Sequence, residues 1–310
     1  MKISFLKKLI WLSIFGILLV SILPNIISNY WLFDIFSNFK LQYLLISIGL
    51  FLLVLISFKK KLSALILIII AVFWNSYFIV PYFLQPNNSP HRKEIKITSV
   101  NLLSSNSQEN LVIKFLTKED PDILILMEFT PKWEEKLDKV IKKYEYREIV
   151  PRLDNFGIAV LSKYKMDSSI DYFDLNNKPS IVSNLELENQ ILSVVATHPI
   201  PPVNQTTFEN RNKQLSNIMR DRDKFSDNLI IAGDFNTSSF SNHFKKLVEG
   251  DLTDSRIGFG LLPTWPSDYK ILQTTLDHFL VSNNLKVIDR NTGPNIGSDH
   301  LPINMVIGIN

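Results

Sequence analysis

The chain has 310 residues, 46% of them hydrophobic and 20% charged, and its formal net charge is +3. This length allows one or two domains with a sizeable core, and the composition excludes a disordered chain. The lack of cysteine excludes disulfides, thiolate zinc sites and a cysteine nucleophile, and the small net charge gives no reason of its own to expect a nucleic-acid partner.

Three apolar stretches open the chain, at about residues 9–27, 41–58 and 62–84, and none of them contains a charged side chain. Each is close to the roughly 20 residues that a helix needs to cross a bilayer core. Buried helices of a soluble protein normally carry a polar stripe, and a cleaved signal peptide would account for the first stretch alone. We therefore predict three transmembrane helices that hold the chain in a membrane through residues 9–84.

The positions of the basic residues predict the orientation in the membrane. They are Lys2, Lys7 and Lys8 before the first stretch and Lys59, Lys60 and Lys61 before the third, whereas the first loop offers only Asp34 and Lys40. Short cytoplasmic loops accumulate Lys and Arg, so the N-terminus and the second loop are expected inside the cell. Three crossings then place everything after Leu84 on the extracytoplasmic side.

A polar segment with two prolines, residues 85–91, follows the third stretch. It predicts a linker, and we divide the chain into a membrane anchor over residues 1–90 and a second domain over residues 91–310. In the second domain, apolar β-branched runs alternate with segments of helical spacing. The predicted strands are 95–100, 123–127, 157–161, 191–196, 229–232, 278–281 and 303–309, and the predicted helices are 109–116, 131–144, 210–225 and 242–248. The pattern indicates a mixed α/β domain.

Polar residues of catalytic type lie at the ends of these predicted strands. They are Asn101, Glu128, His198, Asp234, Asn236, Asp277, Asp299 and His300. Loops at neighbouring strand ends tend to converge on one rim, where carboxylate and amide oxygens suit a hard cation and polar hydrogens suit a phosphate. Each short motif, such as the Gly-Asp-Phe-Asn at residues 233–236, is by itself often an ordinary turn. The ordered set predicts a metal-assisted hydrolase.

This constellation resembles the endonuclease/exonuclease/phosphatase superfamily, the group with the deoxyribonuclease-I-like fold. The resemblance covers about residues 95–310 and rests on the eight residues in their order together with the strand at 157–161. It implies an α/β (α+β) fold in which a two-sheet β-sandwich is flanked by helices in four layers, α/β/β/α, here preceded by the three transmembrane helices.

The resemblance also implies roles for the eight residues. Asn101, Glu128 and Asp299 would bind Mg²⁺, with Mn²⁺ or Ca²⁺ as other possibilities. His198, Asp234, Asn236, Asp277 and His300 would be catalytic: Asp277 would orient His300, and Asn236 and His198 would donate to the phosphoryl or leaving-group oxygen. Either Asp234 or His300 would be the general base. The implied reaction is in-line attack of water on a phosphoester.

Several other polar residues have simpler interpretations. We expect His91 and His243 to be solvated, His278 to be structural, and Trp265 to pack near the rim of the site. Arg211 and Gln214 lie on a predicted helix, where they either approach substrate phosphates or belong to a solvated face.

The sequence leaves three functions open. The first is a membrane-anchored nuclease or phosphodiesterase acting on nucleic acid, the second is the same chemistry on a phospholipid or small phosphodiester, and the third is a non-catalytic, membrane-tethered binding module. The complete set of eight residues favours an enzyme, and no obligate protein partner is indicated.

Overall fold

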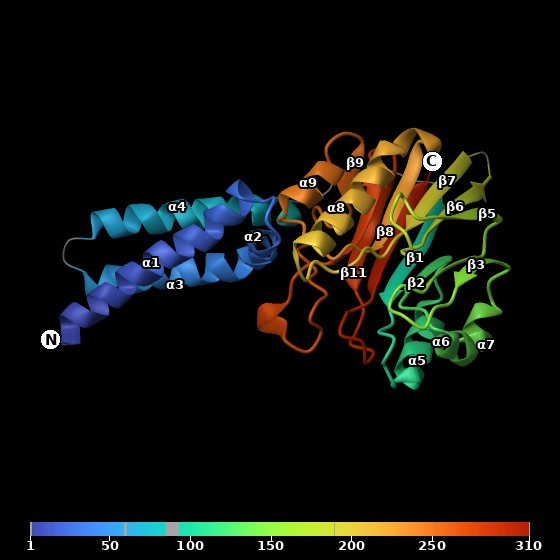
Figure 1. The fold of residues 1–310 in the computed structure, drawn as a ribbon, viewed down its shortest axis with the longest axis horizontal. Helices are drawn as coiled ribbons and strands as arrows, with labels where there is room; N and C mark the ends of the chain where they lie inside the picture. The colour runs from blue at the N-terminus through green and yellow to red at the C-terminus, as the bar shows by residue number, and fades with distance from the viewer. Residues whose placement is uncertain (1, 59–60, 85–92, 189, 310) are drawn as a thin grey trace.

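The computed structural model describes residues 2–58, 61–84, 93–188 and 190–309. Three long helices project together from one end of a two-sheet body (Figure 1). They are α1 (Lys2–Ile26), α3 (Lys40–Ser57) and α4 (Leu62–Ile79), and each lies in a segment long and apolar enough to cross a membrane. The predicted linker at residues 85–91 lies outside the described residues, and the proposed domain division at residue 90 stays a prediction.

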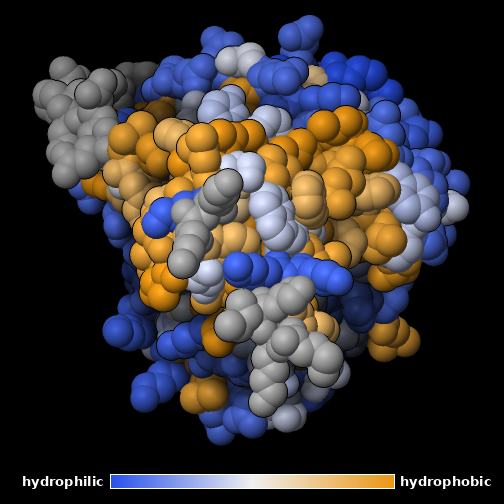
Figure 2. Space-filling model, turned by 90° about the vertical axis from the view of Figure 1, so that its left-hand side faces the viewer, coloured by the Kyte–Doolittle hydropathy of each residue, from blue (hydrophilic) through white to orange (hydrophobic). Residues whose placement is uncertain are grey.

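The surface of the three helices is apolar outward as well as inward. Leu12, Ile56 and Phe73 are more than two-thirds exposed, while Ile14 and Ile68 are buried between the helices. Figure 2, which faces the free end of the helices, shows this apolar surface in front with hydrophilic residues around it. Helices that are hydrophobic all round are typical of membrane spans, so the structure agrees with membrane association.

Short helical segments join the long helices to each other and to the body. The connection from α1 to α3 contains α2 (Trp31–Phe36) and η1 (Ser37–Phe39), and α4 ends in η2 (Val80–Phe83). Residues 31–39, called the docking segment below, lie at the end of the helices that meets the body, whereas the start of α1 lies at the free end (Figure 1). The sequence interpretation treated this segment as a plain loop and missed its helix.

The body contains two six-stranded mixed sheets. The first has the order β11-β12-β1-β2-β4-β3 and the second β5-β6-β7-β8-β10-β9. The strands are β1 (Lys93–Asn101), β2 (Ile123–Met127), β3 (Tyr146–Val150), β4 (Ile158–Ser162), β5 (Met166–Asp171), β6 (Ser180–Leu187), β7 (Gln190–Ala196), β8 (Asn228–Asp234), β9 (Leu252–Asp254), β10 (Asp277–Ser282), β11 (Lys286–Thr292) and β12 (Ile303–Ile309).

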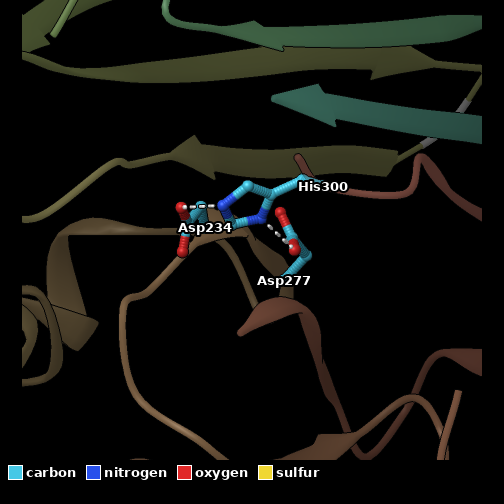
Figure 3. Close-up of side chains that lie close together, drawn as sticks. All are labelled: Asp234, Asp277 and His300. Carbon is cyan, nitrogen blue, oxygen red and sulfur yellow. Dashed lines mark hydrogen bonds and ion pairs between the residues drawn. The ribbon is translucent and has the colours of Figure 1, made fainter. Parts of the chain in front are cut away.

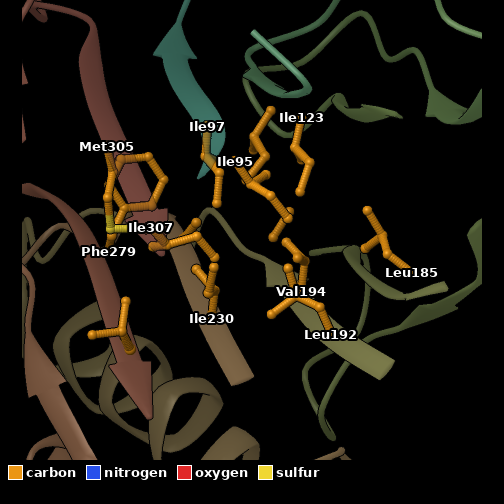
Figure 4. Close-up of a cluster of buried hydrophobic side chains, with 14 of the residues drawn as sticks. Ile95, Ile97, Ile123, Leu185, Leu192, Val194, Ile230, Phe279, Met305 and Ile307 are labelled. Atoms are coloured by element: carbon orange, nitrogen blue, oxygen red, sulfur yellow. The ribbon is translucent and has the colours of Figure 1, made fainter. Parts of the chain in front are cut away.

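The two sheets pack face to face around one apolar core. Ile97, Val194, Ile230, Phe279 and Met305 lie in it, fully buried, and come from both sheets (Figure 4). Strands that are buried on both faces have continuous apolar sequences. For this reason seven of the strands could be predicted from the sequence.

Helices cover the outer face of each sheet. On the first sheet these are α5 (Glu109–Glu119), α6 (Pro131–Lys136) and α7 (Asp138–Ile141), and on the second α8 (Gln205–Arg220), the short η3 (Arg222–Lys224) and α9 (Asn242–Leu247), while η4 (Lys270–Leu272) lies in a loop. The four layers α/β/β/α are therefore confirmed. Two boundaries differ from expectation: the helix predicted at 131–144 is broken at Leu137, and the helix predicted to start at 210 starts at Gln205, capped by the Asn204 side chain.

Candidate active site

The pairing of the strands brings the polar residues to one edge of the sandwich. β1 is parallel to β2, and β7 to β8, so the ends that carry Asn101, Glu128, His198 and Asp234 point the same way. β10 is antiparallel to β8, with Asp277 directly opposite Asp234. The start of β12, just after Asp299 and His300, reaches the same edge because β12 is antiparallel to β1.

The backbone at this edge adopts conformations that side chains rarely tolerate. Glu128 and Asn236 have positive φ angles of 53° and 51°. Gly233 has φ +141°, and a Cβ atom there would lie 2.0 Å from the carbonyl oxygen of Thr197, the neighbour of His198. Strained residues of this kind collect at functional sites, because the turn must aim a side chain in a fixed direction.

The imidazole of His300 lies between two carboxylates (Figure 3). Its Nδ1 is 2.8 Å from Asp277 Oδ2, and its Nε2 is 3.4 Å from Asp234 Oδ2. Burial acts to lower the pKa of His300, but Asp277 and Asp234 outweigh it and raise the pKa to about 10. Two carboxylates facing the two ring nitrogens favour the doubly protonated ring, so His300 is a hydrogen-bond donor in this arrangement.

Asp234 is the centre of the polar cluster. Its Oδ2 lies 3.5 Å from His198 Nε2 and accepts a hydrogen bond from Asn101 Nδ2 at 3.3 Å, while Oδ1 accepts from the backbone N–H of Asn236 at 2.9 Å. Burial acts to raise the pKa of Asp234, but the two imidazoles and the Asn236 N–H lower it well below its usual value. Conversely, the Asp234 carboxylate raises the pKa of His198 against the effect of burial. Asp234 is therefore ionised.

Glu128 and Asp299 have oxygen atoms available for a cation. Glu128 Oε2 accepts from the backbone N–H of Ser104, and Asp299 Oδ2 accepts from Trp265 Nε1 at 3.1 Å. Asp299 Oδ1 is buried and has no hydrogen-bond partner among the described residues. A buried carboxylate oxygen without a partner is costly, and a hard divalent ion is the kind of ligand that would satisfy it.

The eight residues meet at a single pocket of about 700 Å³. Six of them line it, namely Glu128, His198, Asp234, Asn236, Asp299 and His300. Asn101 and Asp277 lie behind them and contact Asp234 and His300. With Asp154 the lining contains four carboxylates and no Lys or Arg among the described residues, so an anionic phosphate would be repelled unless a cation were bound.

A second candidate ligand group for a metal is Asp234, Asp277 and His300, whose ligand atoms lie within 4.8 Å of one another. In this group, however, both nitrogens of His300 already face the carboxylates. The cluster is thus balanced internally, and Glu128 with Asp299 fits a cation better.

The structure corrects several expectations about neighbouring polar residues. Arg211 and Gln214 are buried, so they neither contact a substrate phosphate nor form a solvated face; Arg211 instead pairs with Asp34 of the docking segment. His243 is half-buried, with Nε2 3.0 Å from the Ser28 carbonyl oxygen. His278 is buried between Arg256 and the Thr237 carbonyl, as a structural histidine should be. Trp265 lines the pocket as well as contacting Asp299.

The sequence model of the endonuclease/exonuclease/phosphatase family matches residues 74–300 of this chain. The chain belongs to this family. Its match begins inside α4, so it includes the end of the third apolar helix. Members of the family use divalent metal ions, and the Glu128 and Asp299 carboxylates that line the pocket fit such a cation. The family assignment and the fold inferred from the sequence are therefore confirmed.

Solved structures with the same fold include TDP2 from D. rerio complexed with single strand DNA product, with 18% identity over 70% of this chain and 100% of that chain and a TM-score of 0.60. A functionally unknown conserved protein from Enterococcus faecalis V583 shares 15% identity over 70% of this chain and all of its own, at a TM-score of 0.57. The endonuclease/exonuclease/phosphatase from Bacteroides vulgatus has 15% identity, covers 71% and 100%, and has a TM-score of 0.56. No curated protein matches the chain. These likenesses establish the fold of this family member.

Proposed function

We propose that this family member is a membrane-anchored, divalent-metal-dependent phosphoesterase that hydrolyses phosphodiester bonds by direct attack of water. The observation that carries the proposal is the single pocket in which Glu128, Asp234 and His300 share one cavity with Asp299 and His198. A decayed binding module would have no reason to keep a buried, ion-paired histidine facing that cavity.

The proposed metal ligands are Glu128 and Asp299, with Asn101 beside them. A bound Mg²⁺, or Mn²⁺ or Ca²⁺, would neutralise the carboxylates and withdraw charge from the phosphoryl oxygen. Asn101 already donates to Asp234, so it would fix the position of that carboxylate relative to the metal ligands.

The remaining residues have separate proposed roles in proton transfer and charge stabilisation. Asp234, the ionised group, would orient the attacking water and accept its proton as the water oxygen bonds to phosphorus. His300, held by Asp277, would donate to a phosphoryl oxygen; His198 would protonate the ester oxygen that leaves as its P–O bond breaks. Asn236 would donate its amide N–H to the charge that develops at the five-coordinate phosphorus.

The test is an assay of the full chain in detergent with bis(4-nitrophenyl) phosphate and Mg²⁺, Mn²⁺ or Ca²⁺ in turn. We expect turnover that EDTA abolishes and that metal restores. Replacing Asp234 or His300 by Ala should lower kcat by about 10²-fold or more, because each removes a proton-transfer or charge-stabilising group.

Asp167→Ala is the matched control, since Asp167 is an exposed carboxylate on the edge strand β5. It should keep the wild-type rate. Unchanged turnover in both Asp234→Ala and His300→Ala would show that the site is wrong, and turnover that resists EDTA would exclude a metal-dependent reaction.

Nucleic acid is the second candidate substrate. It is favoured by the D. rerio TDP2 structure, which was solved with a single strand DNA product in the same fold. A single-stranded oligonucleotide therefore belongs in the same assay.

A further inference from the structure

The pocket above the catalytic residues is walled in part by the membrane anchor. Ile35 of α2 and Asn38 of η1 line it together with His198 and His300 of the body. Both anchor residues belong to the segment Trp31–Ser57, which is apolar enough to cross a membrane. The pocket is therefore shared between the body and the docking segment, which lies at the end of the helices that meets the body.

Hydrogen bonds on two sides hold this wall in place. On one side Asp34 pairs with Arg211 at 2.9 Å, and the Trp31 backbone N–H donates to Gln205 Oε1 at 3.1 Å. On the other side Thr274 Oγ1 donates to the Asn38 carbonyl oxygen at 3.1 Å. Because the Asp34–Arg211 pair is buried, the docking segment is a fixed part of the pocket rather than a loose tether.

The pocket has both polar and apolar lining residues. The catalytic carboxylates and imidazoles form one part, while Ile35, Phe156, Ile200, Val203, Trp265 and Leu276 supply apolar surface. A volume of about 700 Å³ is far larger than a phosphate group needs and is typical of a site for a molecule of tens of atoms. Such a pocket fits a substrate with a phosphate at one end and hydrocarbon at the other.

The charges near the pocket do not favour a nucleic-acid strand. A polynucleotide is held chiefly by Lys and Arg along its phosphates, and no such residue lines the pocket among the described residues. Two cations are close to lining residues, but Arg152 pairs with Asp154 at 2.7 Å and Lys178 lies over the Phe156 ring at 3.4 Å.

Exposed apolar side chains project from loops near the pocket. Val203 lines it and is 64% exposed, and Ile271 in η4 is 84% exposed. The Ile271 carbonyl oxygen accepts from Gln42 Nε2 at 2.9 Å, so η4 lies beside the first turn of α3. Gln42 belongs to the apolar segment Trp31–Ser57, so Ile271 lies beside a helix that is apolar enough to cross a membrane.

We propose that the substrate is a lipid phosphodiester taken from the membrane in which the anchor lies, with its phosphate at Asp234 and His300 and its acyl chains along the Ile35 side of the pocket. This inference rests on the proposed phosphoesterase function and specifies its substrate. In the reaction the water oxygen bonds to phosphorus, one ester P–O bond breaks, and the departing alcohol oxygen takes a proton.

The experiment compares two diesters that differ only in their acyl chains. The full chain, reconstituted in nanodiscs with Mg²⁺ or Mn²⁺, is assayed against dihexanoyl phosphatidylglycerol and against the deacylated glycerophosphoglycerol, with bis(4-nitrophenyl) phosphate and a single-stranded oligonucleotide alongside. We expect kcat/KM for the acylated diester to exceed that for the deacylated one by about 10-fold or more, since only the former uses the apolar walls. Ile35→Gln and Val203→Gln should reduce this ratio by several-fold, and Leu111→Gln, an exposed apolar residue on α5, should leave it unchanged.

The outcomes separate this inference from the function on which it rests. Equal kcat/KM for the two diesters, or faster cleavage of the oligonucleotide than of the acylated diester, would overturn the lipid substrate while leaving a phosphoesterase in place. No metal-dependent turnover of any of the four substrates would overturn the phosphoesterase itself.

Discussion

At the scale of single residues, the site is a set of charges that balance one another except at the proposed metal position. His300 and His198 face Asp234, and Asp277 faces His300, so the charges of these four groups offset each other, although His198 Nδ1 is buried without a hydrogen-bond partner among the described residues. Asp299 Oδ1 is the buried oxygen left over among the described carboxylates of the pocket. The order of residues along the chain indicates which side chains belong together, but their pairing depends on the folded arrangement of the strand ends.

The leftover oxygen leads to a prediction for metal binding. Glu128→Gln removes one negative ligand charge from the proposed cation position, so the metal concentration for half-maximal turnover should rise by about 10-fold or more. Metal titrations of activity and isothermal calorimetry with Mn²⁺ would measure it. Glu135→Gln, which changes a largely exposed carboxylate on α6, is the control, and an equal metal requirement in both variants would contradict the assignment.

His278 gives a prediction for stability against pH. Its Nδ1 lies 2.8 Å from Arg256 Nη2 and its Nε2 2.8 Å from the Thr237 carbonyl oxygen. Burial first, and then the Arg256 charge, lower the pKa of His278 from 6.5 to about 3. Between pH 6.5 and 3 the unfolded chain therefore binds a proton at His278 that the folded chain does not bind. The free energy of unfolding is unaffected by this group above pH 6.5. It decreases as the pH falls from 6.5 toward 3, by up to about 1.4 kcal/mol per pH unit.

Melting temperatures of the detergent-solubilised chain between pH 7 and pH 4 would test this. The wild type should lose stability over this range more steeply than His278→Gln, because glutamine has no proton to gain. Parallel curves for the two proteins would mean that His278 is not the group responsible.

At the scale of elements, the sequence predicted seven of the eight inner strands, missing β6, and none of the four edge strands β3, β5, β9 and β11. The inner strands β2 and β4 are buried at every position, so they appear in the sequence as continuous apolar runs. The sequence did not predict β5, whose residues are half-buried or exposed, or β9, which has only three residues. An edge strand contacts a neighbour on one side alone, so its sequence is less constrained. The docking segment was missed for another reason: its stability depends on Arg211, which lies 177 residues away and follows no local rule.

The ion pair between Asp34 and Arg211 leads to a prediction at this scale. Arg211 Nη1 also donates to the Asn236 carbonyl oxygen at 2.7 Å, so one guanidinium joins the docking segment to a residue of the active site. Arg211→Gln leaves Asp34 buried without its cation, and we expect a loss of about 3–5 kcal/mol together with a lower kcat. Thermal melting and the phosphodiester assay would measure the two effects.

Arg220→Gln on the same helix is the matched control. Arg220 pairs with the exposed Asp174 and with Asp221, but Arg220 is itself more than half exposed and Asp221 keeps Lys224 as a partner, so its loss should cost less than about 1 kcal/mol. Equal effects of the two substitutions would show that the docking segment is not held by Arg211.

At the scale of the whole molecule, the three helices place the basic residues and the body at opposite ends. The start of α1, which contains Lys7 and Lys8, and the start of α4, which follows Lys61, lie at the free end of the helices, while the body lies beyond the other end (Figure 1). With basic residues inside, the active site is predicted on the extracytoplasmic side.

A topology reporter tests this orientation. Alkaline phosphatase fused after residue 310 should be active, because that enzyme needs the oxidising extracytoplasmic space, whereas the same reporter fused at Lys61 should be inactive. The opposite pattern would place the body in the cytoplasm and reverse the orientation.

The buried pair of Asp34 and Arg211 also has a consequence for biosynthesis. The ribosome synthesises Asp34 177 residues before it makes the arginine that pairs with it. During that interval the Asp34 carboxylate has no cationic partner, so we expect it to stay hydrated until the body has folded and supplies Arg211. Translation stalled before residue 211 should therefore leave a nascent chain in which Asp34 still lacks the partner of its ion pair.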